Sequence, residues 1–123
     1  MNLMTSLLLA ALAAGSWTAV PGGAWKPAEQ TFEGIQSGLK QFVQKSAADQ
    51  KKTLENWSKY SFQFQGQEKD GRKFIYINAY CINPPEYAEK RFVVVLDGGP
   101  CFFNVKYDPA SHTFYELQFH GEA

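Results

Sequence analysis

Between residues 28 and 57 the apolar side chains recur with the period of an α-helix, and Lys and Gln residues occupy many of the positions between them. The apolar stripe consists of Phe32, Ile35, Leu39, Phe42 and Val43. Leu54 and Trp57 extend the stripe after a pair of alanines. We therefore predict one long helix over about 28–57, with a break near Ser46–Asp49.

From Tyr60 onward the period changes to two, which is typical of half-buried strands. Clusters of Gly, Pro, Asp and Asn separate the apolar runs and predict turns. The five predicted strands cover residues 60–65, 73–81, 91–96, 101–107 and 113–119. One helix followed by five antiparallel strands in meander order predicts a single α+β domain, in which the helix packs on a curved sheet.

The second predicted strand is apolar on both faces, because its aromatic residues alternate with Ile and Ala. One helix covers only one face of a sheet. The other face must then be closed by sheet curvature, by a second copy of the chain or another protein, or by a small ligand. The possible binding surface on this face and its neighbouring turn consists of Tyr76, Tyr80, Asp97, Gly98 and Gly99.

The start of the chain has the character of an export signal. No Asp, Glu, Lys or Arg occurs before Lys26, and Leu3–Ala14 is an apolar run. The run is shorter than the roughly 20 residues that span a bilayer, but it suits the apolar part of a secretory signal. We predict a periplasmic or secreted protein. An uncleaved anchor, which would be its one contact with a membrane, and a buried N-terminal helix are the alternatives.

Two groups of small residues mark where such a signal would be cut. Ala14–Ser16 and Gly22–Ala24 place the cleavage near residue 16 or near residue 24. We assign residues 1–24 to the signal peptide and residues 25–123 to the domain. The Gly- and Pro-rich stretch 17–27 is predicted to be a flexible lead-in.

The charges of the chain narrow the classes of partner. Twelve Lys and Arg residues balance twelve Asp and Glu residues. The basic residues are scattered rather than gathered in a stripe, so we expect no binding to nucleic acid. Zero net charge also provides no long-range attraction to an anionic membrane. The expected partner is therefore a protein or a small ligand.

The two cysteines, Cys81 and Cys101, allow one disulfide, which an oxidising compartment favours. The predicted meander opposes it, because strand 91–96 lies between the cysteines and is roughly 20 Å long. A disulfide needs Cα atoms about 4.4–6.8 Å apart. A bulge, a register shift or an unusual path through Asn83–Lys90 would reconcile the two inferences. Without such a path, the cysteines are inert buried thiols or include one reactive thiol.

No motif of the chain indicates a catalytic, metal or nucleotide site. His112 and His120 are well separated, and a metal site needs three or four convergent ligands. The glycines of Asp97–Pro100 lie between two predicted strands, whereas a phosphate-binding loop leads into a helix. The carboxylates are spread along the chain without a paired spacing. We expect no cofactor, no metal and no enzymatic activity.

Three stretches in the C-terminal half are distinctive, namely Ile75–Cys81, Asp97–Asp108 and Gly121–Ala123. Through them, residues 58–123 resemble a family of small exported bacterial proteins of uncharacterised function. The resemblance implies a secreted or periplasmic location. It implies no activity and no site residues.

The order of the predicted elements also resembles the cystatin-like fold, in which a sheet wraps around one long helix. Cystatins block cysteine proteases with an N-terminal glycine segment and two hairpin loops, which would correspond here to Gly22–Gly23, Gln63–Gly66 and Asp97–Pro100. The chain departs from the cystatin pattern Gln-x-Val-x-Gly, because Gln63–Gly66 is one residue shorter and has no Val. It also has Cys101, not Trp, after Pro100.

Taken together, these features favour a non-enzymatic exported module that binds a protein or a ligand through its sheet face or its hairpin turns. Self-association into a homodimer is one form of this hypothesis. The alternatives are an inhibitor of secreted hydrolases, as the cystatin resemblance implies, and a small enzyme whose site is assembled in space.

Overall fold

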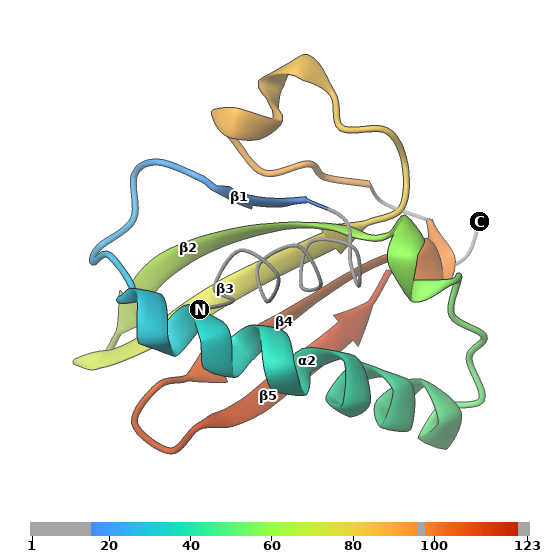
Figure 1. Cartoon of the computed structure of the whole chain (residues 1–123), viewed down its shortest axis with the longest axis horizontal. Coiled ribbons are helices and arrows are strands. Elements are labelled where there is room, and N and C mark those ends of the chain that lie inside the picture. The colour runs from blue at the N-terminus through green and yellow to red at the C-terminus, as the bar shows by residue number, and fades with distance from the viewer. Residues whose placement is uncertain (1–15, 96–97, 121–123) are drawn as a thin grey trace, which may run out of the picture.

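The computed structural model describes residues 16–95 and 98–120. Within these ranges one α-helix, α2 (Glu29–Asp49), and a five-stranded sheet form an α+β fold, as the sequence predicts (Figure 1). The strands, in both chain order and sheet order, are β1 (Trp17–Ala19), β2 (Ser61–Lys69), β3 (Arg72–Tyr80), β4 (Phe102–Asp108) and β5 (Thr113–Phe119). Most of the predicted signal peptide, residues 1–15, lies outside the described residues, as does Asp97.

The sheet is mixed, so the prediction of a purely antiparallel sheet is wrong. β1 runs parallel to β2, whereas the other neighbouring strands are antiparallel. The Trp17 ring stacks on Phe62 with 4.4 Å between ring centroids, and it stands edge-on to Phe32 at 5.0 Å. An aromatic side chain buried in this way contributes a large apolar area. Residues 17–19 therefore form an edge strand, although the sequence predicts a flexible lead-in there.

Helix α2 lies across one face of the sheet (Figure 1). Its buried stripe consists of Ile35, Leu39, Val43 and Ala47. These side chains share one core cluster with residues of the sheet, including Phe62, Ile75, Ile77, Phe103 and Val105. Because complete burial of an Ile, Leu or Val side chain is worth about 1.5–3 kcal/mol, this stripe is sufficient to hold the helix on the sheet.

The helix ends at Asp49, near the predicted break, and does not continue to residue 57. Lys51 has a φ of 58°, and the backbone N–H groups of Lys51 and Lys52 donate to the carbonyls of Ala48 and Ala47. This pair of bonds is the Schellman arrangement that closes a helix. Trp57 lies beyond it in a short 3₁₀ helix, η1 (Trp57–Lys59), from which its side chain reaches the core.

β2 and β3 form a hairpin of nine residues on each strand. Asp70 and Gly71 close it with φ values of 53° and 79°. Two successive residues with positive φ match the turn type that suits the twist of a two-residue hairpin. A turn is therefore present between the first two predicted strands, 60–65 and 73–81, but the strands extend further toward it than predicted.

The predicted strand 91–96 is not a strand in residues 91–95, and β4 pairs directly with β3 instead. The chain from Ile82 to Val95, which we call the outer segment, includes a 3₁₀ helix, η2 (Glu86–Glu89). Two buried side chains of the sheet hold its backbone. Gln63 Nε2 donates to the carbonyls of Ala88 and Arg91, each at 2.8 Å, and Asn78 Nδ2 donates to Val93 at 2.8 Å.

The outer segment closes the sheet face opposite to α2, where it rises at the top of Figure 1. A second, smaller core forms between this segment and the sheet, and its buried members are Tyr80, Ala88, Val93 and Phe102. The apolar character of β3 on both faces is thus explained by two cores. Chain from the same domain covers part of the face for which the sequence suggested curvature, a partner or a ligand.

Candidate ligand pocket

The predicted binding surface on the sheet face is largely covered. Tyr80 is 1% exposed, and its hydroxyl has no hydrogen-bond partner among the described residues. Burial raises the pKa of this phenol. Tyr76 is half-buried, with its ring edge-on to Phe92 at 5.1 Å. Tyr80 therefore presents no free ring to a partner, whereas Tyr76 is only partly covered.

The glycines of that surface, Gly98 and Gly99, lie just before β4. Gly98 is half-buried, and Gly99 is buried in a 3₁₀ helix, η3 (Gly99–Cys101), with a φ of 60°. The positive φ explains why a glycine stands there. The structure therefore assigns a turn-forming role to Gly99.

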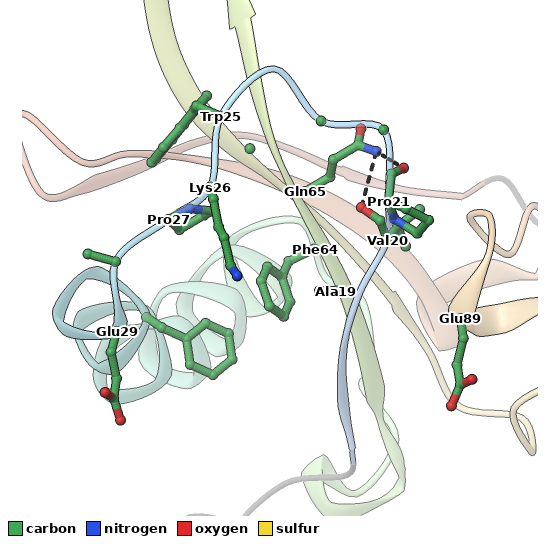
Figure 2. Close-up of a pocket in the computed structure, with 15 residues that line it drawn as sticks. Ala19, Val20, Pro21, Trp25, Lys26, Pro27, Glu29, Phe64, Gln65 and Glu89 are labelled. Carbon is green, nitrogen blue, oxygen red and sulfur yellow. Dashed lines mark hydrogen bonds between the residues drawn. The ribbon is translucent and has the colours of Figure 1, made fainter.

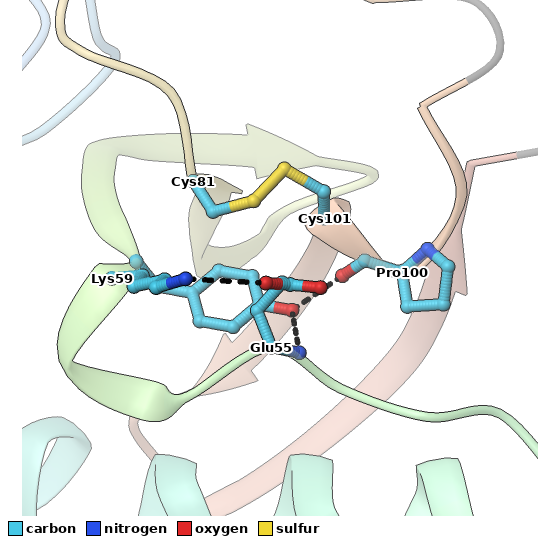
Figure 3. Close-up of a disulfide and its surroundings, with 6 residues drawn as sticks. Glu55, Lys59, Cys81, Pro100 and Cys101 are labelled. Atoms are coloured by element: carbon cyan, nitrogen blue, oxygen red, sulfur yellow. Dashed lines mark hydrogen bonds and ion pairs between the residues drawn. A yellow bond between two sulfur atoms is a disulfide. The ribbon is translucent and has the colours of Figure 1, made fainter.

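Cys81 and Cys101 form a disulfide, with their Cα atoms 5.3 Å apart (Figure 3). The conflict anticipated from the sequence disappears because β4 pairs directly with β3. Tyr80, the last residue of β3, pairs with Phe102, the first residue of β4, so the adjoining cysteines meet. The disulfide makes the outer segment part of a covalently closed loop.

The region beside the disulfide is held by polar contacts as well (Figure 3). The Tyr60 hydroxyl donates to the carbonyl of Pro100 at 2.6 Å and accepts the backbone N–H of Glu55 at 3.3 Å. Glu55 and Lys59 form an ion pair at 3.7 Å. These contacts tie η1 to η3, and they offer no free group for chemistry.

The two histidines lie apart and contact different partners. His112 is exposed, with Nδ1 facing the Tyr107 hydroxyl at 3.3 Å. His120 is half-buried between Asn104 and the carbonyl of Val95. His120 thus ties the end of the outer segment to the sheet. The described residues contain no group of three His, Cys, Asp or Glu side chains that could hold a metal ion.

A pocket of about 900 Å³ lies at the other end of the sheet, where the chain passes from β1 to α2 (Figure 2). This connection, residues 20–28, arches over β2, and we call it the arch. The volume falls within the range of small-molecule sites, about 300–1,000 Å³. The sequence pattern does not predict a pocket in this region.

The arch is attached to β2 at its start and at its middle. The N–H groups of Val20 and Ala24 donate to the carbonyls of Phe64 and Gly66 at 2.9 and 2.8 Å. Trp25 Nε1 donates to the carbonyl of Gln67 at 2.8 Å. A Cβ on Gly66 would lie 2.2 Å from the Trp25 carbonyl oxygen, so this close approach requires glycine.

Aromatic rings form part of the inner surface of the pocket. Phe32 from α2 and Phe64 from β2 both line it, with 4.8 Å between their ring centroids. The other apolar lining residues are Ala19, Val20, Pro21, Trp25, Pro27 and Ala28. Such a concave apolar surface is suited to the apolar body of a small molecule.

Three charged residues stand at the edge of the pocket, namely Lys26, Glu29 and Glu89. None of them belongs to the ion pairs found among the described residues. In Figure 2 the Lys26 side chain points toward Phe64, whereas the carboxylates of Glu29 and Glu89 point away from it. The cation is therefore the charge that faces the apolar interior.

No family model matches this chain, and neither does any curated protein or solved structure. No helix within the described part of the chain combines the length and the apolar character that crossing a membrane requires. The function is therefore argued from the geometry and chemistry of the pocket itself.

Proposed function

We propose that this protein is a non-enzymatic binding protein that holds a small apolar molecule in the pocket beneath the arch. The observation that carries the proposal is the aromatic inner surface formed by Phe32, Phe64 and Trp25 within a volume of about 900 Å³. Apolar concave sites with a few polar groups at the edge are the usual form of small-molecule sites.

The lining supports binding more than catalysis. Among the described residues it contains no Ser, Thr, Cys or His, the side chains that most often act as nucleophile or general base. Its titratable groups are Lys26, Glu29 and Glu89, and in Figure 2 they do not converge on one point.

Export is part of the proposal and rests on two features. The apolar run Leu3–Ala14 has the length of a secretory signal core. The Cys81–Cys101 disulfide suits an oxidising compartment such as a periplasm or an extracellular space.

The geometry gives less support to a cystatin-type inhibitor. Such a wedge needs three loops side by side, but Gln63–Gly66 lies within β2 and Gln63 is fully buried. Pro100 lies near Tyr60, at the end of β2 away from its turn with β3. Binding through the sheet face also loses support, because Tyr80 is buried.

The proposal is tested by titrating the purified, disulfide-bonded protein with the neutral dye Nile red, whose fluorescence rises in an apolar site. Phe32→Ala should weaken binding by about tenfold or more, because the ring forms part of the pocket wall. Ala19→Phe, a substitution at an exposed lining position, should block the pocket by filling it.

Phe42→Ala is the matched control. Phe42 is also a half-buried phenylalanine of α2, and its ring packs on Phe114 at 5.4 Å and does not line the pocket. The Phe42→Ala variant should bind the dye as the wild type does. The proposal is wrong if the wild type does not bind, or if Phe32→Ala and Ala19→Phe bind the dye as well as Phe42→Ala does.

A further inference from the structure

The polar groups of the pocket wall are almost all engaged with one another. Trp25 Nε1 donates to the carbonyl of Gln67, and Gln65 Nε2 donates to the carbonyls of Pro21 and Val20 at 2.8 and 3.3 Å. Gln65 Oε1 accepts Gln67 Nε2 at 2.8 Å. These side chains therefore have little hydrogen-bonding capacity left for a ligand.

Lys26 is the exception among the side-chain donors that line the pocket. Its ammonium group has no carboxylate within ion-pair distance among the described residues. Its backbone is held between Trp25, which bridges to Gly66, and Pro27, whose ring fixes its own φ. The side chain points toward Phe64 in Figure 2. A cation is thus presented over an apolar surface without a partner.

We propose that the ligand is an apolar carboxylate, with its alkyl or aryl body against Phe32 and Phe64 and its carboxylate on the Lys26 ammonium. This inference rests on the proposed function and names the ligand class of the same pocket. A charge-assisted bond between ammonium and carboxylate is stronger than a neutral hydrogen bond.

A cationic ligand fits the pocket less well, although two carboxylates stand near its edge. Lys26 would repel a cation placed over Phe64, because like charges in apolar surroundings disfavour each other. Glu29 lies in the first turn of α2, where the helix dipole already favours a negative charge. Glu89 projects from η2, outside the arch.

The inference is tested by calorimetric titration with three molecules that share one chain and differ in the head group, namely decanoate, decanol and decylamine. The wild type should bind decanoate about tenfold more tightly than decanol, and decylamine most weakly. Added salt should reduce the difference. Naphthoate, titrated in parallel, decides between a chain and a ring system, and tight binding of either supports the proposal.

Three variants test whether the preference for decanoate over decanol depends on Lys26. Lys26→Gln should bind decanoate and decanol with equal affinity, whereas Lys26→Arg should keep the preference for decanoate. Lys40→Gln removes a cation from an exposed position of α2 outside the pocket and should behave as the wild type.

The outcomes separate the two proposals. If decanoate and decanol bind equally to the wild type, if decylamine binds most tightly, or if Lys26→Gln keeps the preference, the ligand class is wrong. Binding of decanol that is lost in Phe32→Ala would then still support the apolar pocket. If none of the ligands binds and Nile red does not bind, both proposals are wrong.

Discussion

Gln63 and Asn78 face each other across β2 and β3, and their side chains act as one unit that fastens the outer segment to the sheet. Asn78 Nδ2 donates to Gln63 Oε1 at 3.0 Å, and the same oxygen accepts the N–H of Val93 at 2.8 Å. Gln63 is fully buried and Asn78 is 4% exposed. Two amides thereby satisfy backbone groups that a neighbouring strand would otherwise satisfy.

Gln63→Leu should therefore lower the free energy of unfolding by about 3 kcal/mol, because it leaves two carbonyls and one N–H buried without partners. Urea denaturation measures the change. Gln44→Leu, on the exposed face of α2, is the control and should change stability by less than about 0.5 kcal/mol. Equal midpoints for the two variants would show that the amides do not hold the outer segment.

Two buried tyrosines should respond in opposite ways to the loss of their hydroxyls. Tyr80→Phe removes a buried hydroxyl that has no partner in the described structure, so it should stabilise the protein by about 1 kcal/mol. Tyr60→Phe removes the bonds to Pro100 and Glu55, so it should destabilise it by about 1–2 kcal/mol. Thermal melts compare the two. A loss of stability in Tyr80→Phe would indicate that its hydroxyl has a partner.

The loss of stability at alkaline pH should depend in part on Tyr80. Burial raises the pKa of its phenol above its ordinary value of about 10. A group whose pKa is raised in the folded state contributes stability that is complete below its unfolded pKa and is lost as the pH rises through its folded pKa. Urea midpoints measured from neutral to alkaline pH should therefore fall less steeply above pH 10 in Tyr80→Phe than in the wild type. Identical slopes would contradict the prediction.

The disulfide should make a separate contribution to stability. Replacing Cys81 and Cys101 together by Ser should lower the free energy of unfolding by about 3 kcal/mol, the loss expected for a loop of this size. Alkylation of the unreduced wild type in denaturant, followed by mass measurement, should modify no thiol. Modification of two thiols would show that the bridge is not formed in the expressed protein.

The structure also favours one of the two predicted cleavage sites. Cutting near residue 24 would remove β1, the stacking of Trp17 on Phe62 and the buried Val20, whereas cutting near residue 16 would keep them. We expect the exported chain to begin at or near Trp17, as its intact mass would show. A chain that starts at Trp25 should be less stable by about 3 kcal/mol or more than one that starts at Trp17. Equal stability of the two chains would remove the structural argument for cleavage near residue 16.

The elements that periodicity alone determines were predictable. The stripe of α2, the alternation in β2 and the Asp70–Gly71 turn all carry local signals that the tertiary structure follows. The run Arg91–Leu96 carries an equally strong strand signal. Residues 91–95 leave the sheet because Gln63 and Asn78 supply their hydrogen bonds from a distance in sequence. Asn78, within the otherwise apolar run Phe74–Cys81, was the available sign of this, whereas Gln63 alternates with apolar residues as the other glutamines of β2 do.

The pocket was not predictable, because it depends on how the arch lies over β2. Gly22, Gly23 and Pro21 indicate a flexible stretch when they are considered alone. The pair Trp17 and Trp25 argued against that interpretation, because two large apolar rings are unfavourable in a solvated linker. Because both rings are partly buried, residues 17–19 form an edge strand and the arch forms a wall of the pocket.

The attachment of the arch implies that a ligand in the pocket would also affect how readily β1 opens. β1 has three residues and continues directly into the arch, so the wall of the pocket and the edge of the sheet are one stretch of backbone. Short edge strands open more readily than central ones. A ligand that holds the arch closed must then slow amide hydrogen exchange in β1 by mass action. Fraying of the sheet edge would thus be coupled to release of the proposed ligand.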